Sequence, residues 1–237
     1  MQRQDAPLIL LTRLAQASAR FAARLALAHP GAQVLISPLQ EVRFLDWPRP
    51  EGAPDALIFT SQNAVEAAAR AGLSGRAFCV GDQTRQAAMS AGFGAVSAGG
   101  DAQDLVALIR AERPQHLWHL HGRDPRGDVA GQLRAEGFTV AQAVVYETLP
   151  MALTAEALAA LAGDRNLLVP LFSPKSAALA AAALAGAMAP LVLLCLSPAV
   201  EQSLGVLAAH PRAVARRPDA DGMLEIIARA LNSGALP

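Results

Sequence analysis

Short apolar runs alternate with amphipathic stretches along the whole chain of 237 residues. Several runs are continuously apolar and too short for helices, which is typical of strands buried on both faces of a parallel sheet. We predict strands at 8–12, 32–37, 56–61, 77–81, 116–122, 139–147, 167–173, 191–197 and 213–215. The amphipathic stretches predict helices at 16–28, 63–71, 84–91, 102–111, 129–136, 176–187, 199–208 and 223–231. This alternation indicates an α/β protein.

The chain contains a weak internal repeat. Residues 10–39 and 119–150 each read as a strand, a turn with an arginine, a helix, a glycine and a second strand. Three shorter pairs follow the same scheme: 58–69 with 170–181, 79–84 with 195–200, and 99–109 with 217–227. We therefore expect two similar doubly wound, flavodoxin-like domains with parallel sheets.

The repeat also predicts the domain boundaries. If residues 1–36 pack with 152–237, one domain is built from both ends of the chain and 42–142 form the other. Two extended crossings, 37–41 and 143–151, each contain a proline and would make a two-stranded linker. A double connection predicts a hinge with a ligand cleft lined by both domains.

Composition narrows the classes of function. Lys plus Arg and Asp plus Glu both number 20, so the protein lacks the long-range field that binding to nucleic acid or an anionic membrane requires. Cys79 and Cys195 are too few for a disulfide framework, which suits a reducing compartment. The N-terminal apolar run is too short for a signal peptide, and the uncharged stretch 177–196 suits a helix followed by a strand. We expect a cytoplasmic protein.

Small polar residues and glycines gather where the predicted strands end. In a doubly wound sheet the ligand site lies at the carboxyl ends of the strands, and hydroxyls and free N–H groups of helix first turns suit anions there. Each hydroxyl could equally be no more than a helix N-cap. The candidate binding residues are Thr12, Arg13, Thr60, Ser61, Gly81, Thr84, Gly122, Arg123, Ser173, Lys175, Ser176 and Ser197.

Among these, Arg13, Arg123 and Lys175 are the candidate partners for ligand carboxylates, and arginine suits pairing through two hydrogen bonds. Arg126 is a weaker candidate of the same kind. Tyr146, the only tyrosine, lies in the second crossing, where its phenol could donate a proton or a hydrogen bond to a leaving hydroxyl. It could equally pack against the linker and bond to backbone groups.

Three histidines fall on one predicted strand. His119 and His121 share one face of it and His116 points to the other. No acidic or cysteine ligands accompany them, so we expect no metal site. The sequence also lacks the glycine-rich phosphate-binding motifs and the nucleophile elbow, and no catalytic triad is visible. The residues alone do not fix a reaction.

The order and spacing of several short motifs resemble the uroporphyrinogen-III synthase family. The motifs are LLTR, ALIFTSQNAVEA, CVGDQT, GRD, VVYET, LFSPKSA and a final acidic-Gly-Met-Leu helix, and they cover essentially the whole chain. The resemblance implies two α/β domains joined by a two-stranded ladder, one of them built from both chain ends. Carried over by motif, it implies site roles for Thr60, Ser61, Gly81, Thr84, Tyr146, Ser173 and Ser176.

The resemblance also implies a lyase of porphyrin and heme biosynthesis. Hydroxymethylbilane, a linear tetrapyrrole, would lose its ring A hydroxyl as water and close to uroporphyrinogen III through a spiro intermediate that inverts ring D. The substrate also cyclises unaided to the uninverted isomer I, so the enzyme's main task would be to hold a folded conformation. The resemblance further implies that no cofactor or metal is needed. We expect a monomer that contacts, transiently, the enzyme that makes hydroxymethylbilane.

One position departs from the family pattern, and two rival functions stay open. Where the family often has Gly-Pro-Thr-Thr, this chain has Ser197-Pro198-Ala199-Val200, so a threonine hydroxyl is missing at Val200. A cytosolic two-domain binding or sensor protein for a small anionic ligand would share the hinge and the anion site. A sugar-phosphate isomerase would need a general base, for which His121 is the candidate.

Overall fold

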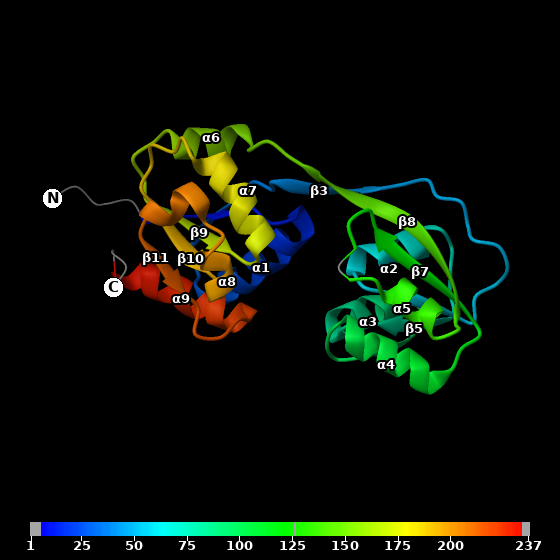
Figure 1. Cartoon of the computed structure of the whole chain (residues 1–237). Helices are drawn as coiled ribbons and strands as arrows, with labels where there is room; N and C mark the ends of the chain where they lie inside the picture. Colours follow the sequence, from blue (N-terminus) through cyan, green and yellow to red (C-terminus); the bar gives the residue numbers. More distant parts are fainter. Residues whose placement is uncertain (1–5, 126, 234–237) are drawn as a thin grey trace. The chain divides into compact units, whose positions relative to one another are not determined.

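The computed structural model describes residues 6–125 and 127–233. The chain divides into two compact units (Figure 1). Unit 1 comprises Met1–Glu41 and Pro150–Pro237, and unit 2 comprises Val42–Leu149. The chain passes from one unit to the other inside β3 (Gln40–Phe44) and at the end of β8 (Thr139–Pro150).

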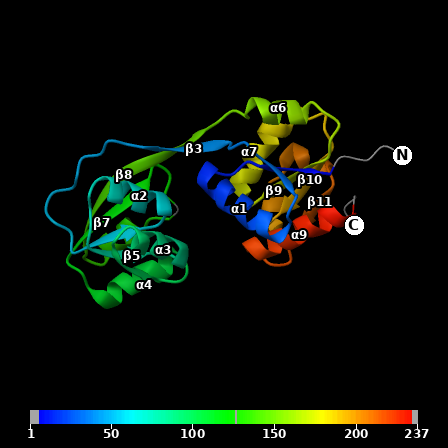
Figure 2. The same cartoon turned by 180° about the vertical axis from the view of Figure 1, so that it is seen from behind.

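The sheet of unit 1 has the strand order β11-β10-β9-β1-β2, with every neighbouring pair parallel. Its strands are β1 (Leu8–Leu11), β2 (Gln33–Ile36), β9 (Leu167–Leu171), β10 (Leu191–Cys195) and β11 (Arg212–Val214). One face is covered by α1 (Ala15–Ala28) and α9 (Ala220–Ser233), which lie side by side in Figure 2. The other is covered by α6 (Ala155–Leu161), α7 (Pro174–Leu184), α8 (Pro198–Glu201) and the 3-10 helix η1 (Gly205–Ala209).

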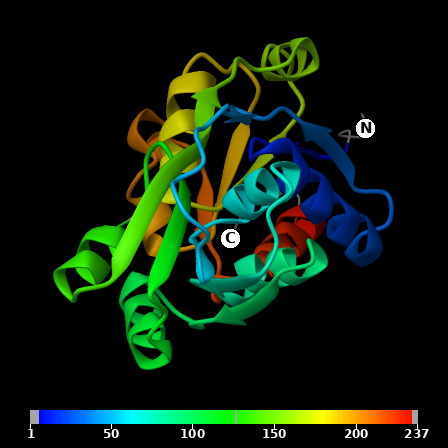
Figure 3. The ribbon, with the colours of Figure 1, turned by 90° about the vertical axis from the view of Figure 1, so that its right-hand side faces the viewer.

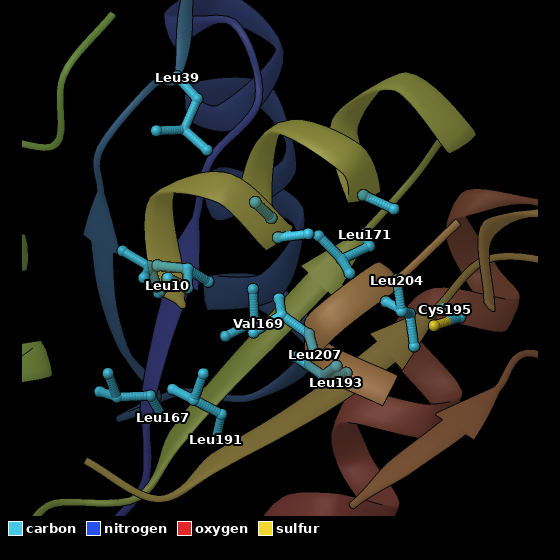
Figure 4. Close-up of a cluster of buried hydrophobic side chains, with 14 of the residues drawn as sticks. Leu10, Leu39, Leu167, Val169, Leu171, Leu191, Leu193, Cys195, Leu204 and Leu207 are labelled. Carbon is cyan, nitrogen blue, oxygen red and sulfur yellow. The ribbon is translucent and has the colours of Figure 1, made fainter. Parts of the chain in front are cut away.

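Two hydrophobic cores follow from this layering. Side chains alternate between the faces of a strand, so a continuously apolar strand serves both cores. Leu10 and Val169 point toward α7 (Figure 4), whereas Ile9 and Leu168 belong to the core beneath α1 and α9. The apolar runs of the sequence are therefore buried on both sides.

The sheet of unit 2 has the order β3-β8-β7-β4-β5-β6. Its other strands are β4 (Ala56–Phe59), β5 (Arg76–Cys79), β6 (Gly94–Ser97) and β7 (His116–Gly122). Figure 3 shows the green strands β7 and β8 side by side, and they pair in parallel. The helices α2 (Gln62–Arg70) and α3 (Asp82–Ser90) pack on one face, and α4 (Ala102–Glu112) and α5 (Val129–Ala135) pack on the other.

The strands that the sequence repeat pairs occupy matching places in the two sheets. The order β2-β1-β9-β10-β11 in unit 1 corresponds to β8-β7-β4-β5-β6 in unit 2. Unit 2 has one additional strand, β3, which is the outermost strand and pairs with β8. In each sheet the carboxyl ends of the corresponding parallel strands lie along one side, which we call the carboxyl edge. The carboxyl edges of the two units can therefore be compared residue by residue.

Several elements differ from the sequence prediction. The strands β3 and β6 and the helix α6 were not predicted, because QEVRF and GAVS lack a continuous apolar run. The single helix expected at 199–208 is instead α8 followed by η1. The break spans residues 202–204, and η1 begins at Gly205, whose φ of 54° is left-handed. The uncharged stretch 177–196 forms most of α7 and then β10. No helix of the described ranges is long and apolar enough to cross a membrane.

Candidate active site

Two side chains from different strands of unit 2 meet at the carboxyl edge of its sheet. Tyr146 lies on β8 and Ser61 follows β4, and the phenol oxygen is 2.9 Å from Ser61 Oγ. Ser61 is the N-cap of α2, where its Oγ accepts the backbone N–H of Ala64 at 3.2 Å. The helix start thus fixes the serine hydroxyl, which in turn orients the phenol.

Gly122 makes room for the tyrosine ring. The register of β7 and β8 shifts after His121, so that Gly122 pairs with Tyr146. A Cβ at position 122 would lie 2.6 Å from Tyr146 Cζ, well inside the contact distance of two carbon atoms. Any residue larger than glycine would therefore displace the ring from its place beside Ser61.

A cavity of about 430 Å³ lies at the same edge. It is lined by residues that follow β4 and β5, by the start of α4 and by one glycine between β7 and α5: Thr60, Val80, Asp101, Ala102, Gln103 and Gly127. Asp101 caps α4 with its own side chain, which accepts the N–H groups of Gln103 and Asp104. Of the candidate binding residues predicted from the sequence, Thr60 is the one that lines this cavity.

Gly81 and Thr84 lie at the start of α3. Gly81 is the N-cap residue and has no side chain to close the helix end. Thr84, within the first turn, is buried. The start of α3 can therefore offer its first backbone N–H groups to a ligand, whereas the Thr84 side chain is buried.

Next to Tyr146 in the chain, Glu147 forms a charged group with Arg43 and Arg123. The sequence predicted Arg123 as a binding residue but not Arg43 or Glu147. The Glu147 side chain is only 10% exposed. Its Oε1 accepts Arg43 Nε at 2.8 Å and also Nη2, and its Oε2 accepts Arg123 Nε at 2.8 Å. Hydrogen bonds from Arg123 and then Arg43 hold the pKa of Glu147 below its usual range, so it is ionised at neutral pH.

The corresponding edge of unit 1 carries Thr12 and Arg13 after β1. Thr12 is 3% exposed, and its Oγ1 has no hydrogen-bond partner among the described residues. The Arg13 guanidinium lies 4.0 Å from the centroid of the Phe172 ring, a cation–π contact. Burial, and secondly Arg20, lower the pKa of Arg13. Thr12 does not cap the following helix, because the N-cap of α1 is Leu14.

Four further candidates surround the starts of α7 and α8. Ser173 and Ser176 form a capping box, in which each Oγ accepts the other residue's backbone N–H at 3.1 and 3.0 Å. Lys175, between them, is exposed. Ser197 is the N-cap of α8, but its side chain makes no capping bond. Val200 packs in the core of unit 1 beside residues of β10, so a hydroxyl here would be buried.

The histidines and cysteines do not form a reactive centre. His119 is 2% exposed, neither ring nitrogen has a partner among the described residues, and burial, then His121, lowers its pKa to about 3. His121 is buried and its Nδ1 lies 2.8 Å from the Gly122 carbonyl oxygen, which does not suit a free general base. Burial raises the pKa of both thiols, Cys79 and Cys195, to about 11.

Within residues 6–125 and 127–233, no three His, Cys, Asp or Glu side chains lie close enough together to hold a metal ion. Arg126, the weaker candidate for a carboxylate partner, lies outside the described residues. The hydroxyl, guanidinium and phenol groups at the described edges can form hydrogen bonds, bind anions and, at Tyr146, donate a proton.

Two solved structures with a similar fold are both named as uroporphyrinogen-III synthases. The crystal structure of uroporphyrinogen-III synthetase from Helicobacter pylori is 17% identical in sequence, with a TM-score of 0.65 over 94% of this chain and 99% of that one. A mutant uroporphyrinogen III synthase from Thermus thermophilus is 19% identical, with a TM-score of 0.51 over 96% and 100%. These likenesses establish the α/β fold with parallel sheets.

Sequence comparison then assigns the family. The search of curated proteins gave no match. The sequence model of the family described as uroporphyrinogen-III synthase HemD matches residues 20–225, most of the chain. The matched range includes Ser61, Gly122 and Tyr146. This chain belongs to the uroporphyrinogen-III synthase family.

Proposed function

We propose that hydroxymethylbilane binds at the carboxyl edges of the sheets and that Tyr146 starts its cyclisation. The reaction comes with the family: a uroporphyrinogen-III synthase is a lyase of tetrapyrrole biosynthesis that cyclises hydroxymethylbilane to uroporphyrinogen III with loss of water. The observation that carries the proposal is the 2.9 Å contact between the Tyr146 phenol and Ser61 Oγ.

The direction of this hydrogen bond decides what the phenol can do. Ser61 Oγ already accepts the Ala64 N–H, and it has one proton of its own to donate. When Ser61 donates that proton to the tyrosine oxygen, the phenolic hydrogen is left for a ligand. Tyr146 can then protonate the ring A hydroxyl as it leaves as water.

The remaining steps need positioning more than further proton transfer. The carbon that has lost water is electrophilic, and the substituted carbon of ring D attacks it to form the spiro intermediate. This fragments and recloses with ring D inverted, and the proton that the product loses on closing replaces the one given by Tyr146. Holding the linear substrate folded selects this path over unaided closure to isomer I.

The substrate's carboxylates give the edges their role. In unit 2 the proposed binding residues are Thr60, Ser61, Gly81, Thr84, Gly122 and Arg123, and in unit 1 they are Thr12, Arg13, Ser173, Lys175, Ser176 and Ser197. Backbone N–H groups and hydroxyls can bind anions without a high net charge. Binding is thereby spread over many groups, and we propose that none of them is indispensable.

We further propose that each unit is a flavodoxin-like domain, with residues 1–36 and 152–237 in one, 42–142 in the other, and 37–41 and 143–151 as the two-stranded linker. The order β2-β1-β9-β10-β11 supports this, because flavodoxin-like sheets have the order 2-1-3-4-5. We also propose a cytoplasmic monomer that uses no cofactor. A transient contact with the enzyme that makes hydroxymethylbilane would shorten the time available for unaided closure.

A product assay tests the proposal. Hydroxymethylbilane is generated in the presence of the protein, the products are oxidised, and isomers I and III are separated by chromatography. We expect isomer III to predominate. Isomer I alone, from a sample whose folding is verified by circular dichroism, would contradict the proposal and favour a binding or sensor role.

A further inference from the structure

Glu147 has no part in the proton transfer, yet it is a nearly buried carboxylate beside Tyr146. It lies on β8, and Arg43 reaches it from the neighbouring edge strand β3. The Leu45 N–H donates to the Val145 carbonyl at 3.1 Å and the Met151 N–H to the Leu39 carbonyl at 2.9 Å, so residue numbers run in opposite directions along these two segments. The ladder therefore brings Arg43 directly to Glu147.

Arg123 arrives at the same carboxylate from β7. Its backbone N–H donates to the Tyr146 carbonyl at 3.0 Å, which ties the end of β7 to the residue before Glu147. Its Nε then donates to Glu147 Oε2 at 2.8 Å. Backbone and side chain are both held, so the guanidinium has a defined direction.

The arginine heads remain open to solvent although their inner nitrogens are held. The side chains of Arg43 and Arg123 are 61% and 59% exposed, against 10% for Glu147. Within the described part of the chain, the side-chain bonds of Arg123 use Nε alone, which leaves the Nη1 and Nη2 donors for an anion. The three residues together carry one excess positive charge.

We propose that Glu147 is a positioning residue, which fixes the guanidiniums of Arg43 and Arg123 as two receptors for substrate carboxylates at the carboxyl edge of unit 2. The proposal rests on the proposed function and adds Arg43 to the binding residues. A fork that is already oriented loses less conformational freedom when a carboxylate binds. The ordered pair would thus favour one folded conformation of the substrate.

Positioning and simple charge attraction predict opposite effects when Glu147 loses its charge. Glu147→Gln removes a negative charge, so attraction alone would strengthen the binding of a polyanion and lower KM. If Glu147 acts by orienting the arginines, its loss frees both heads and raises KM. We expect KM for hydroxymethylbilane to rise about tenfold, equivalent to about one charge-assisted hydrogen bond, with kcat changed less than about twofold and more isomer I formed.

Glu136→Gln is the matched control. Glu136 also pairs with an arginine through two hydrogen bonds, to Arg110 Nε and Nη2, and it lies in unit 2 at the end of α5, away from Tyr146. We expect its KM and product ratio to equal those of the wild type. Circular dichroism and thermal melting of both variants verify that they are folded.

Arg43→Lys is a second variant that keeps every charge and removes the fork. The positioning role predicts a rise in KM here too, since an ammonium cannot hold two directed bonds to Glu147 while presenting others. If the wild type makes isomer III while KM is unchanged or lower in Glu147→Gln, or unchanged in Arg43→Lys, the positioning role is overturned alone. Isomer I alone from the wild type would overturn the proposed function and the positioning role with it.

Discussion

The two units present matching sheet edges with different chemistry. In unit 2, β7 ends at Gly122, beside the ring of Tyr146, whereas in unit 1 β1 is followed by Thr12, whose buried hydroxyl has no hydrogen-bond partner among the described residues. The next residue is an arginine in both units. Arg123 is held by a carboxylate, and Arg13 lies against the Phe172 ring.

The serine N-caps differ in the same way. The Ser61 hydroxyl also bonds to the Tyr146 phenol, whereas the hydrogen bonds of Ser173 are made to Ser176 within the capping box. A repeated scaffold thus fixes where the polar groups lie, and a few substitutions decide what they do. Unit 2 carries a phenol and a charge-paired cluster, and unit 1 carries hydroxyls and a cation held by an aromatic ring.

Removing the phenolic hydroxyl should have the largest effect on kcat, because the carboxyl edge of unit 2 would then lack a phenol, as that of unit 1 does. Tyr146→Phe keeps the ring above Gly122 and removes the phenolic hydroxyl, the proposed proton donor. We expect kcat to fall by about 100-fold, the lower end of the range for a general acid, with isomer III still detectable. Rapid-quench measurement of isomer III formation checks this. Complete loss of turnover in a folded variant would show that a single residue is indispensable.

The buried histidine should make unit 2 lose stability in acid. Burial keeps His119 of unit 2 neutral, with a pKa of about 3. An unfolded chain takes up this proton below about pH 6.5, so stability is full above that pH and falls as the pH drops toward 3. At pH 5 the loss amounts to about 2 kcal/mol.

His119→Ile is the variant that tests this acid sensitivity. It should remove that part of the pH dependence in denaturant titrations between pH 7 and 5, because isoleucine does not titrate. His116→Asn, at the exposed start of the same strand, serves as the control and should retain the wild-type slope. An unchanged slope in His119→Ile would assign the acid sensitivity to other groups.

The two serine caps separate folding from catalysis. Ser61→Ala and Ser173→Ala should each lower the free energy of unfolding by about 1 kcal/mol, the usual value for loss of a helix cap. Only Ser61→Ala should also lower kcat, by roughly 3- to 10-fold, because it alone orients the phenol. Equal kcat values in the two variants would mean that Tyr146 is oriented without Ser61.

The smallest expected effect concerns Thr12. Thr12→Val replaces an unpartnered buried hydroxyl by a methyl group of similar size, so the free energy of unfolding should rise by about 1 kcal/mol. If the hydroxyl also binds substrate, KM should rise by about threefold, the equivalent of part of one hydrogen bond. Chemical denaturation and steady-state kinetics give the two values. A more stable variant with unchanged KM would remove Thr12 from the binding residues.

Periodicity predicted most of the strands and helices because buried parallel strands need continuous apolar runs, as in β4 and β10. The same reasoning missed β3, whose QEVRF sequence alternates charged and apolar residues at a sheet edge. Placing candidates at strand ends identified Ser61, and the sole tyrosine in the second crossing identified Tyr146. Neither argument predicted their contact, which joins residues 85 positions apart.

Glu147 and Arg43 show why the rest of the site escaped prediction. They lie 104 positions apart and meet through the pairing of β3 with β8, which apolar patterning did not reveal. One clue was present in the sequence. A glutamate directly after the sole tyrosine, within a largely apolar strand, needs a cationic partner when it is buried.

The discontinuous composition of unit 1 has a consequence for biosynthesis. Its first two strands leave the ribosome early, but β9, which pairs with β1, comes only after all of unit 2 has been made. Unit 2 can fold as one continuous stretch, while β1 waits with an unpaired edge that invites pairing with other chains. A nonsense mutation between residues 150 and 167 would therefore leave a complete unit 2 attached to an aggregation-prone N-terminal segment.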